Sequence, residues 1–165
     1  MTASLQEIFE SRSVAVVGAS KDPSKAGHQV VRTLLAVGYL GKIYPVNPNE
    51  TEILGLPCYR SITEIKEPLD LLVICLPGKA VITVMEEAER RGDVKGAVVL
   101  SAGFAETAIP ENIRLQEQLV EIARRAGLRV FGPNCIGIMN PDLKLVTGFH
   151  PGVSLVPGNL GYVTQ

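Results

Sequence analysis

Short apolar runs recur along the chain, and each of them stops abruptly at glycine, asparagine, proline or serine. Most lack the alternation of apolar and polar residues that marks a strand with one solvent-exposed face. Uninterrupted runs of this kind are typical of parallel strands that are covered on both faces. The predicted strands cover residues 14–17, 42–46, 70–76, 96–100 and 128–131, with a small flap over residues 53–59 and one helical turn over residues 63–66.

Between the runs, apolar residues recur at the spacing of amphipathic helices. Residues 4–11 form a short first helix, and the longest helix begins at Pro110. The crossover helices end at Gly38, Gly92 and Gly127, because glycine readily takes the left-handed conformation that stops a helix. Strands that alternate with helices predict an α/β fold: a Rossmann-like, doubly wound, mostly parallel sheet with helices on both faces.

The alternation of strands and helices stops after Gly137, where prolines and glycines become frequent. A short strand is expected at residues 144–147 and the start of another at residues 160–165, with no helix after it. We therefore expect one domain over residues 1–140, followed over residues 141–165 by an exit segment and the first strand of a truncated next domain.

Composition restricts the possible functions. Of the 165 residues, 46% are hydrophobic and 20% charged, as in ordinary soluble domains, and the formal net charge of −1 gives no overall attraction to nucleic acid or an anionic membrane. The chain has neither a membrane-length apolar run nor a signal-peptide layout, so a cytoplasmic protein is expected. Cys58, Cys75 and Cys135 are too widely spaced for a disulfide framework, and His28 and His150 lack partners at metal-ligand spacing. Free thiols and no metal are expected.

The first strand delivers the most distinctive loop of the chain. Gly18 lets a ligand approach the backbone closely. Ser20 adds a donor, and Lys21 and Lys25 add positive charge, beside the start of the next helix, where free amides and the helix dipole favour an anion. Since ligands of open parallel sheets lie beyond the carboxyl ends of the strands, this pattern favours a phosphate site. In the alternative interpretation, the glycines and prolines at the strand ends only turn the chain.

A dinucleotide site is disfavoured. Its fingerprint is Gly-x-Gly-x-x-Gly, with an acidic residue about 20 residues further on that binds the ribose hydroxyls. Here Gly18 is followed by Ala19 and Ser20, the next glycine is Gly27, and the second strand ends at Asn47. The longer, lysine-bearing loop fits an extended pyrophosphate ligand with an additional phosphate better than NAD.

An ordered series of motifs resembles a known family. The motifs are Val-Val-Gly-Ala-Ser at 16–20, Tyr-Pro-Val-Asn-Pro at 44–48, Leu-Gly-Leu-Pro-Cys-Tyr at 54–59, Ser-Ala-Gly-Phe at 101–104 and Gly-Pro-Asn-Cys-Ile-Gly at 132–137. They are similar to the CoA-binding domain of NDP-forming acyl-CoA synthetases, which is also the N-terminal part of the succinyl-CoA synthetase alpha subunit. The resemblance extends over residues 4–165.

The resemblance implies a coenzyme A site built from the strand-end loops. The first loop would hold the CoA phosphates, the turn after the second strand would border the nucleotide end, and the loop after the fourth would contact the cofactor arm. The loop after the fifth strand would close the site. The implied CoA-binding residues are Gly18, Ala19, Ser20, Lys21, Lys25, Asn47, Pro48, Pro77, Leu100, Ser101, Ala102, Gly132, Pro133 and Asn134.

The chain departs from the family pattern at one turn. Relatives often carry a lysine directly after the turn that corresponds to Asn47-Pro48, where this chain has Asn49 and Glu50. The missing lysine implies either weaker CoA binding or a phosphate contact that shifts to Lys21, Lys25 or Lys79.

The family reaction converts acyl-CoA, ADP and phosphate into the acid, CoA and ATP through an acyl phosphate and a phosphohistidine. Because that histidine belongs to a later domain, the resemblance implies that this chain binds CoA without catalysing and works with an ATP-grasp subunit or domain and downstream ligase domains. His150 lies in the exit segment, and no catalytic residue is predicted. Two alternatives are a CoA-binding regulatory domain of a protein lysine acetyltransferase and a stand-alone CoA- or NAD(H)-sensing module.

Overall fold

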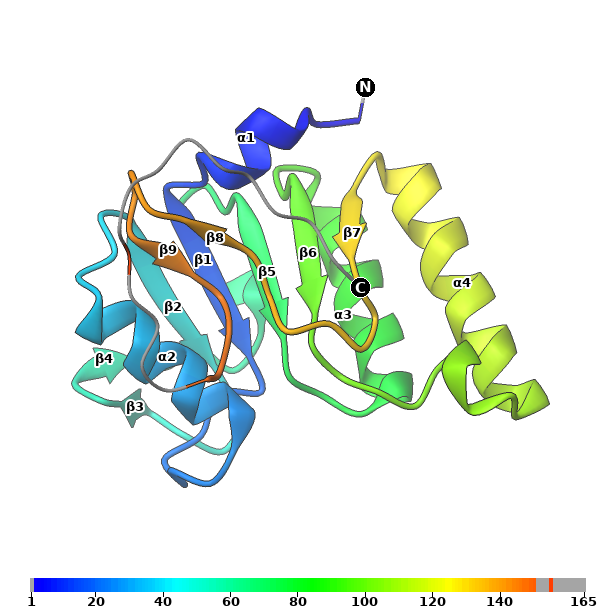
Figure 1. Ribbon diagram of the computed structural model, residues 1–165, viewed down its shortest axis with the longest axis horizontal. Coiled ribbons are helices and arrows are strands. Elements are labelled where there is room, and N and C mark those ends of the chain that lie inside the picture. Colours follow the sequence, from blue (N-terminus) through cyan, green and yellow to red (C-terminus); the bar gives the residue numbers. More distant parts are fainter. Residues whose placement is uncertain (1, 151–154, 156–165) are drawn as a thin grey trace.

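The computed structural model describes residues 2–150 and residue 155. Its centre is a five-stranded parallel sheet with the order β2-β1-β5-β6-β7 (Figure 1). The strands are β1 (Ser13–Val17), β2 (Lys42–Val46), β5 (Leu71–Ile74), β6 (Gly96–Val99) and β7 (Arg129–Phe131). The helices are α1 (Leu5–Phe9), α2 (Ala26–Ala36), α3 (Gly78–Arg91) and α4 (Pro110–Ala126), with 3₁₀ turns η1 (Ile62–Glu64) and η2 (Ala105–Thr107). The predicted Rossmann-like α/β fold is confirmed.

The sheet separates two hydrophobic cores. Ala15 and Val17 of β1 face a core that also contains the buried residues of α3 and α4. Val14 and Val16 face the other core, which contains the buried residues of α1 and α2. Since successive side chains of a strand point to opposite faces, β1 needs apolar residues throughout, and all five of its residues are buried.

Local chemistry explains where the elements begin and end. Ser4 and Glu7 form a capping box at α1, in which the Ser4 hydroxyl accepts from the Glu7 amide at 3.2 Å. Gly92 and Gly127 end α3 and α4 in the left-handed conformation, as predicted. Pro45 is tolerated because β2 is an edge strand of the sheet. The third sheet strand is shorter than predicted, since β5 ends at Ile74.

Two small hairpins complete the fold. The predicted flap is the antiparallel pair β3 (Glu52–Ile53) and β4 (Leu56–Pro57). A second antiparallel pair, β8 (Met139–Asn140) and β9 (Leu145–Val146), lies in front of the sheet on the α2 side (Figure 1).

The second hairpin includes part of the predicted exit segment. Leu145 of β9 is fully buried in the same core as α2, so the chain just beyond residue 140 packs on the domain. The domain boundary at residue 140 stays a prediction, and the strand expected at residues 160–165 lies outside the described residues. No helix in the described part of the chain is long and apolar enough to span a membrane.

Candidate functional site

Five loops lie at the carboxyl edge of the sheet, one after each strand. The strand order reverses beside β1, and in such sheets the crevice at the reversal is the usual ligand site. The loops after β1 and β5 are in direct contact, because a Cβ at Gly18 would lie 2.7 Å from the carbonyl oxygen of Cys75. The Asn47 side-chain amide donates to the carbonyl of Ala19 at 2.7 Å, and the Asn134 amide donates to that of Ser101 at 2.9 Å. These contacts join the loops after β2, β1 and β5 in one group and the loops after β6 and β7 in another.

The loop after β1 lies against the start of α2. Gly18 has a φ of +86°, and its amide donates to Val46 of β2 at 3.0 Å. A Cβ at Gly27 would lie only 2.0 Å from the carbonyl oxygen of Gly18. Gly27 therefore allows the helix to approach the strand end closely, which is the role of the third glycine in the dinucleotide fingerprint. The sequence does not match the fingerprint, but the structure supplies that part of its geometry.

Polar side chains fix the conformation of this loop. The Asp22 amide donates to the Ser20 hydroxyl oxygen at 3.1 Å, and Asp22 in turn accepts from the Ser24 amide at 2.9 Å and hydroxyl at 2.7 Å. The hydrogen bonds from Ser24 lower the pKa of the Asp22 carboxyl. The buried His28 has its Nδ1 2.8 Å from the Ser20 carbonyl oxygen, and because a carbonyl only accepts, Nδ1 carries the proton. The Ser20 hydroxyl hydrogen stays available to donate to a ligand.

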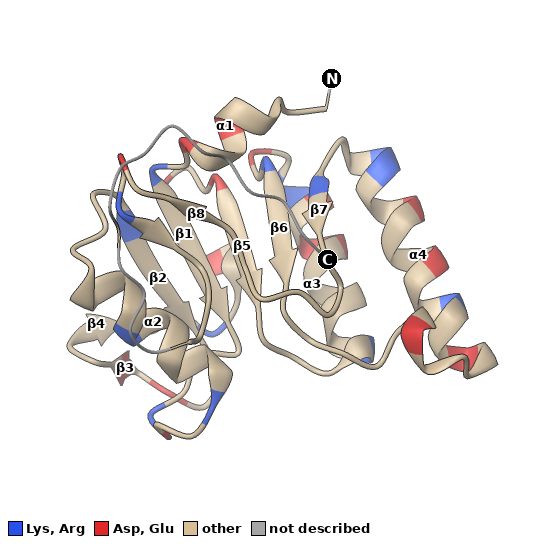
Figure 2. Cartoon of the chain, viewed as in Figure 1, with Lys and Arg blue, Asp and Glu red and all other residues tan. Residues whose placement is uncertain are grey.

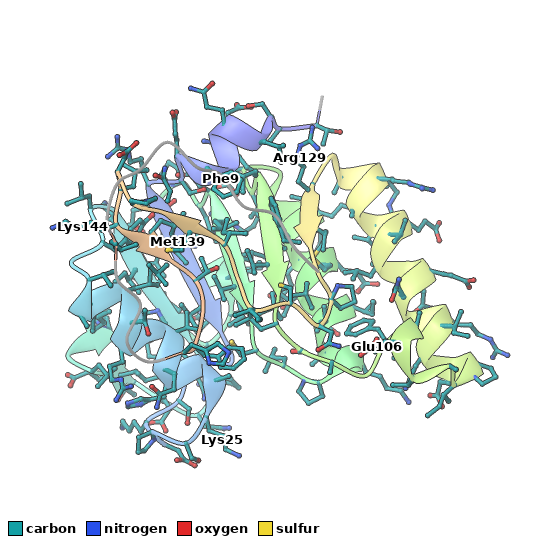
Figure 3. The ribbon with its side chains drawn as sticks, viewed as in Figure 1. Phe9, Lys25, Glu106, Arg129, Met139 and Lys144 are labelled. Carbon is teal, nitrogen blue, oxygen red and sulfur yellow. The ribbon has the colours of Figure 1, made fainter. Side chains whose placement is uncertain are left out.

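The predicted lysines differ in what they contact. Lys21 pairs with Glu50 at 2.8 Å, and this hydrogen bond and charge raise the pKa of Lys21. Lys25 precedes α2 as its N-terminal cap residue and is exposed at the rim of the loop (Figure 3). Lys79 pairs with Glu111 of α4 at 2.9 Å. Lys25 and the first amides of α2 are therefore the groups best placed for an anion.

The loops after β6 and β7 form the other half of the edge. Leu100 is buried, whereas Ala102 and Asn134 are exposed and Ser101 is half-buried. The Gly132-Pro133 peptide bond is cis, and Gly132 has a φ of +95°. The two remaining predicted residues, Pro48 and Pro77, are exposed in the turn after β2 and directly before α3.

Sequence reasoning missed three groups at this edge. The sequence singles out Glu50 only as a departure from a family pattern, places His28 on a helix face or at the edge of a ligand, and gives Glu106 no role. The Glu106 carboxylate accepts from the amides of Gly103 at 2.7 Å and Phe104 at 3.0 Å, and the Gly103 bond is the main cause of its lowered pKa. A carboxylate three residues after a glycine, in a loop that follows a strand, is the signal from which Glu106 could have been found.

Burial disfavours the thiolate form of all three cysteines. Burial raises the pKa of the Cys75 thiol to about 12 and also raises the pKa values of Cys58 and Cys135. Since the thiolate is the reactive form, these environments suppress thiol chemistry.

The chain matches a known protein family over most of its length. Residues 12–141 match the family model described as "CoA binding domain". The chain belongs to this CoA-binding domain family. Its motifs at the strand ends, from Gly18 to Asn134, lie within the matched residues.

Several relatives have names that state ADP-forming ligation. The chain is 40% identical over 161 residues to acetate–CoA ligase [ADP-forming] II of Archaeoglobus fulgidus, an alignment covering 98% of this chain and 24% of the relative. It is 41% identical over 161 residues to acetate–CoA ligase [ADP-forming] II subunit alpha of Pyrococcus furiosus, covering 98% of this chain and 34% of that subunit. The chain thus spans about a quarter to a third of the length of these relatives.

A solved structure has the same fold. The dinucleotide-forming acetyl-coenzyme A synthetase 1 of Ca. Korarchaeum cryptofilum, in complex with phosphate and ADP, matches with a TM-score of 0.85 and 41% sequence identity over 90% of this chain and 31% of that one. These relatives support the CoA-binding domain of an ADP-forming acyl-CoA synthetase and do not favour the acetyltransferase regulator or the stand-alone sensing module.

Proposed function

We propose that the chain binds coenzyme A across the carboxyl edge of the sheet and serves as the CoA-binding part of an ADP-forming acyl-CoA synthetase. The family match over residues 12–141 carries this proposal. The geometry supports it, because the close approach of Gly27 to Gly18 places the loop after β1 directly against the start of α2, where the first amides of the helix favour a pyrophosphate.

The individual residues would divide the work along the extended cofactor. Gly18 and Ala19, whose amides donate to the Val46 carbonyl, would let the phosphates approach the backbone closely, and Ser20 would present its hydroxyl donor. Lys21 and Lys25 would add positive charge. Asn47 and Pro48 would border the nucleotide end. Bound CoA would supply the thiol that carries the acyl group, and the remaining residues would orient its arm. These remaining residues are Pro77, Leu100, Ser101, Ala102, Gly132, Pro133 and Asn134.

The complete reaction would need more protein than this chain. The relatives whose names state ADP-forming ligation are three to four times as long or are one subunit of an enzyme. We expect an ATP-grasp module and further ligase domains to supply nucleotide binding and the phosphorylated group. The three free thiols fit a reducing compartment, and we expect the protein in the cytoplasm.

Calorimetric titration with CoA, dephospho-CoA and NADH tests this proposal. CoA is expected to bind most tightly, with its affinity falling when the 3′-phosphate is removed and when salt is raised, since charge-assisted contacts are screened. Tighter binding of NADH than of CoA would contradict the assignment.

Two variants test the first loop. S20A is expected to weaken CoA binding about tenfold and K25A about fivefold, because each removes a charge-assisted contact. Matched controls are S4A, before α1, and K42A, at the first residue of β2, both at the opposite edge of the sheet. Unchanged affinity in both S20A and K25A would exclude the loop from the site.

A further inference from the structure

An acidic residue neutralises one of the two lysines of the loop over residues 18–25, which follows β1 and is called the phosphate loop below. Lys21 Nζ lies 2.8 Å from Glu50 Oε2, and the Glu50 side chain is 24% exposed whereas that of Lys21 is 60% exposed. Charges of both signs lie side by side around this loop and the adjacent flap (Figure 2). Lys25, the other lysine of this loop, takes part in none of the ion pairs found among the described residues.

Contacts of Asn47 hold the turn that leads to Glu50, whose own amide donates to the Asn47 carbonyl at 3.4 Å. The Asn47 amide donates to the Tyr59 carbonyl at 2.8 Å, and the Asn47 side chain both donates to Ala19 at 2.7 Å and accepts from the Asn49 amide at 2.9 Å. The turn is therefore attached to the flap on one side and to the phosphate loop on the other. The ion pair between Lys21 and Glu50 adds a second connection between the turn and the phosphate loop.

Glu50 lies where it would act on one particular part of a nucleotide. In doubly wound sheets the pyrophosphate lies at the start of the first crossover helix, and the ribose lies beyond the end of the second strand, where a carboxylate discriminates against a ribose phosphate. Glu50 follows the end of β2 by four residues. Its charge is therefore directed at the ribose end of a ligand rather than at the pyrophosphate.

On the basis of the proposed function, we propose that Glu50 determines specificity by weakening recognition of the CoA ribose phosphate. Glu50 acts in two ways. Its ion pair with Lys21 reduces the positive charge that Lys21 offers to a phosphate. Its carboxylate also places a negative charge near the negatively charged 3′-phosphate. An exposed ion pair contributes little stability, so the domain does not need Glu50 in order to fold. The 3′-phosphate dianion of bound CoA, in contrast, would be repelled directly by the negative charge of this carboxylate.

The variant E50Q tests the proposal, with E89Q as its matched control. Both substitutions remove one lysine- or arginine-paired carboxylate, but Glu89 pairs with Arg125 near the ends of α3 and α4, at the opposite edge of the sheet. Titration of each protein with CoA and with dephospho-CoA gives the ratio of the two affinities. E50Q is expected to bind CoA about fivefold more tightly and dephospho-CoA less than twofold more tightly, whereas E89Q leaves both affinities unchanged.

The possible outcomes separate this inference from the proposed function. If the unmodified chain binds CoA and E50Q leaves the ratio of affinities unchanged, Glu50 has no role in specificity, and CoA binding itself stands. Equal gains for both ligands would indicate a general change in the loop and would also overturn the inference. If neither the unmodified chain nor E50Q binds CoA, both the proposed function and this inference fail.

Discussion

A methyl group at position 27 would lie 2.0 Å from the carbonyl oxygen of Gly18, a distance that no relaxed structure tolerates. The opposing atom belongs to the backbone, so α2 and the phosphate loop must move apart. G27A is expected to lower the free energy of unfolding by about 3 kcal/mol and to weaken CoA binding at least tenfold. Urea unfolding and calorimetry measure these two effects.

The matched control for this prediction is G92A. Gly92 also needs its conformational freedom, with a φ of +73°, but a Cβ there would meet nothing within 4 Å. The G92A substitution should lower the free energy of unfolding by about 1 kcal/mol, the usual penalty for a residue with a side chain in the left-handed conformation, and leave CoA binding unchanged. A loss of stability in G27A no larger than in G92A would show that α2 does not pack this closely on the loop.

Asp70 gives the domain a defined dependence on pH. Burial tends to raise the pKa of its carboxyl, but Lys95 at 2.7 Å and the Arg12 amide at 2.7 Å outweigh burial and lower it below the ordinary value of 3.8. Because the folded state favours the charged form, its contribution to stability is full above about pH 4 and is lost as the pH falls through the lowered pKa. D70N is therefore expected to be less stable than the unmodified protein by about 1–2 kcal/mol at pH 7.

Urea unfolding at pH 7, 5 and 3 measures this difference. The gap between D70N and the unmodified protein should be the same at pH 7 and pH 5 and smaller at pH 3. A gap that stays constant down to pH 3 would mean that Asp70 does not titrate differently in the folded and unfolded states.

At the scale of elements, α1 shows how a five-residue helix depends on tertiary contacts. Ile8 is fully buried, and Phe9 packs edge-on against Phe131 of β7 with ring centroids 6.0 Å apart. Figure 3 shows Phe9 at the edge of the sheet opposite Lys25. I8A is expected to lower the free energy of unfolding by about 2–4 kcal/mol without changing CoA affinity in the folded protein. Leu5, in the same helix, is 53% exposed, so L5A should change the free energy of unfolding by less than about 0.5 kcal/mol.

Chemical denaturation and calorimetry separate the two roles of α1. Equal destabilisation by I8A and L5A would mean that the helix does not dock through Ile8. Weakened CoA binding in folded I8A would mean that the site depends on the far edge of the sheet.

The elements could be predicted from the sequence because each carries a local signal. Mostly apolar runs predicted the five sheet strands, and glycine predicted the ends of α3 and α4, since a left-handed residue is a local requirement. The Lys21–Glu50 pair and the contact between Gly27 and Gly18 could not be predicted in this way. Both join segments through three-dimensional packing, and neither leaves a periodic trace in the sequence. The predicted CoA-binding residues were located on adjoining loops, but their roles stay predictions.

At the scale of the whole molecule, the chain is expected to bind CoA without catalysing ligation. Incubation with acetyl-CoA, ADP and phosphate should give no ATP above the background of a protein-free sample, because the relatives with this named activity contain far more protein than the CoA-binding domain. A coupled ATP assay measures this, with calorimetric CoA binding by the same sample as the positive control. ATP formation by the purified chain would contradict the proposal that it supplies only the CoA-binding part.

The partition of the molecule by its sheet has a consequence for how the sequence can vary. The core on the α2 side supports the helix whose start faces the phosphate loop, whereas the core on the α3 and α4 side is separated from it by the sheet. Substitutions in well-separated sites add their effects nearly independently. Buried residues of α3 and α4 themselves, unlike Val17 and Val46 at the strand ends of the same core, can therefore be exchanged to adjust stability, in nature or by design, with little effect on the ligand-facing geometry at the start of α2.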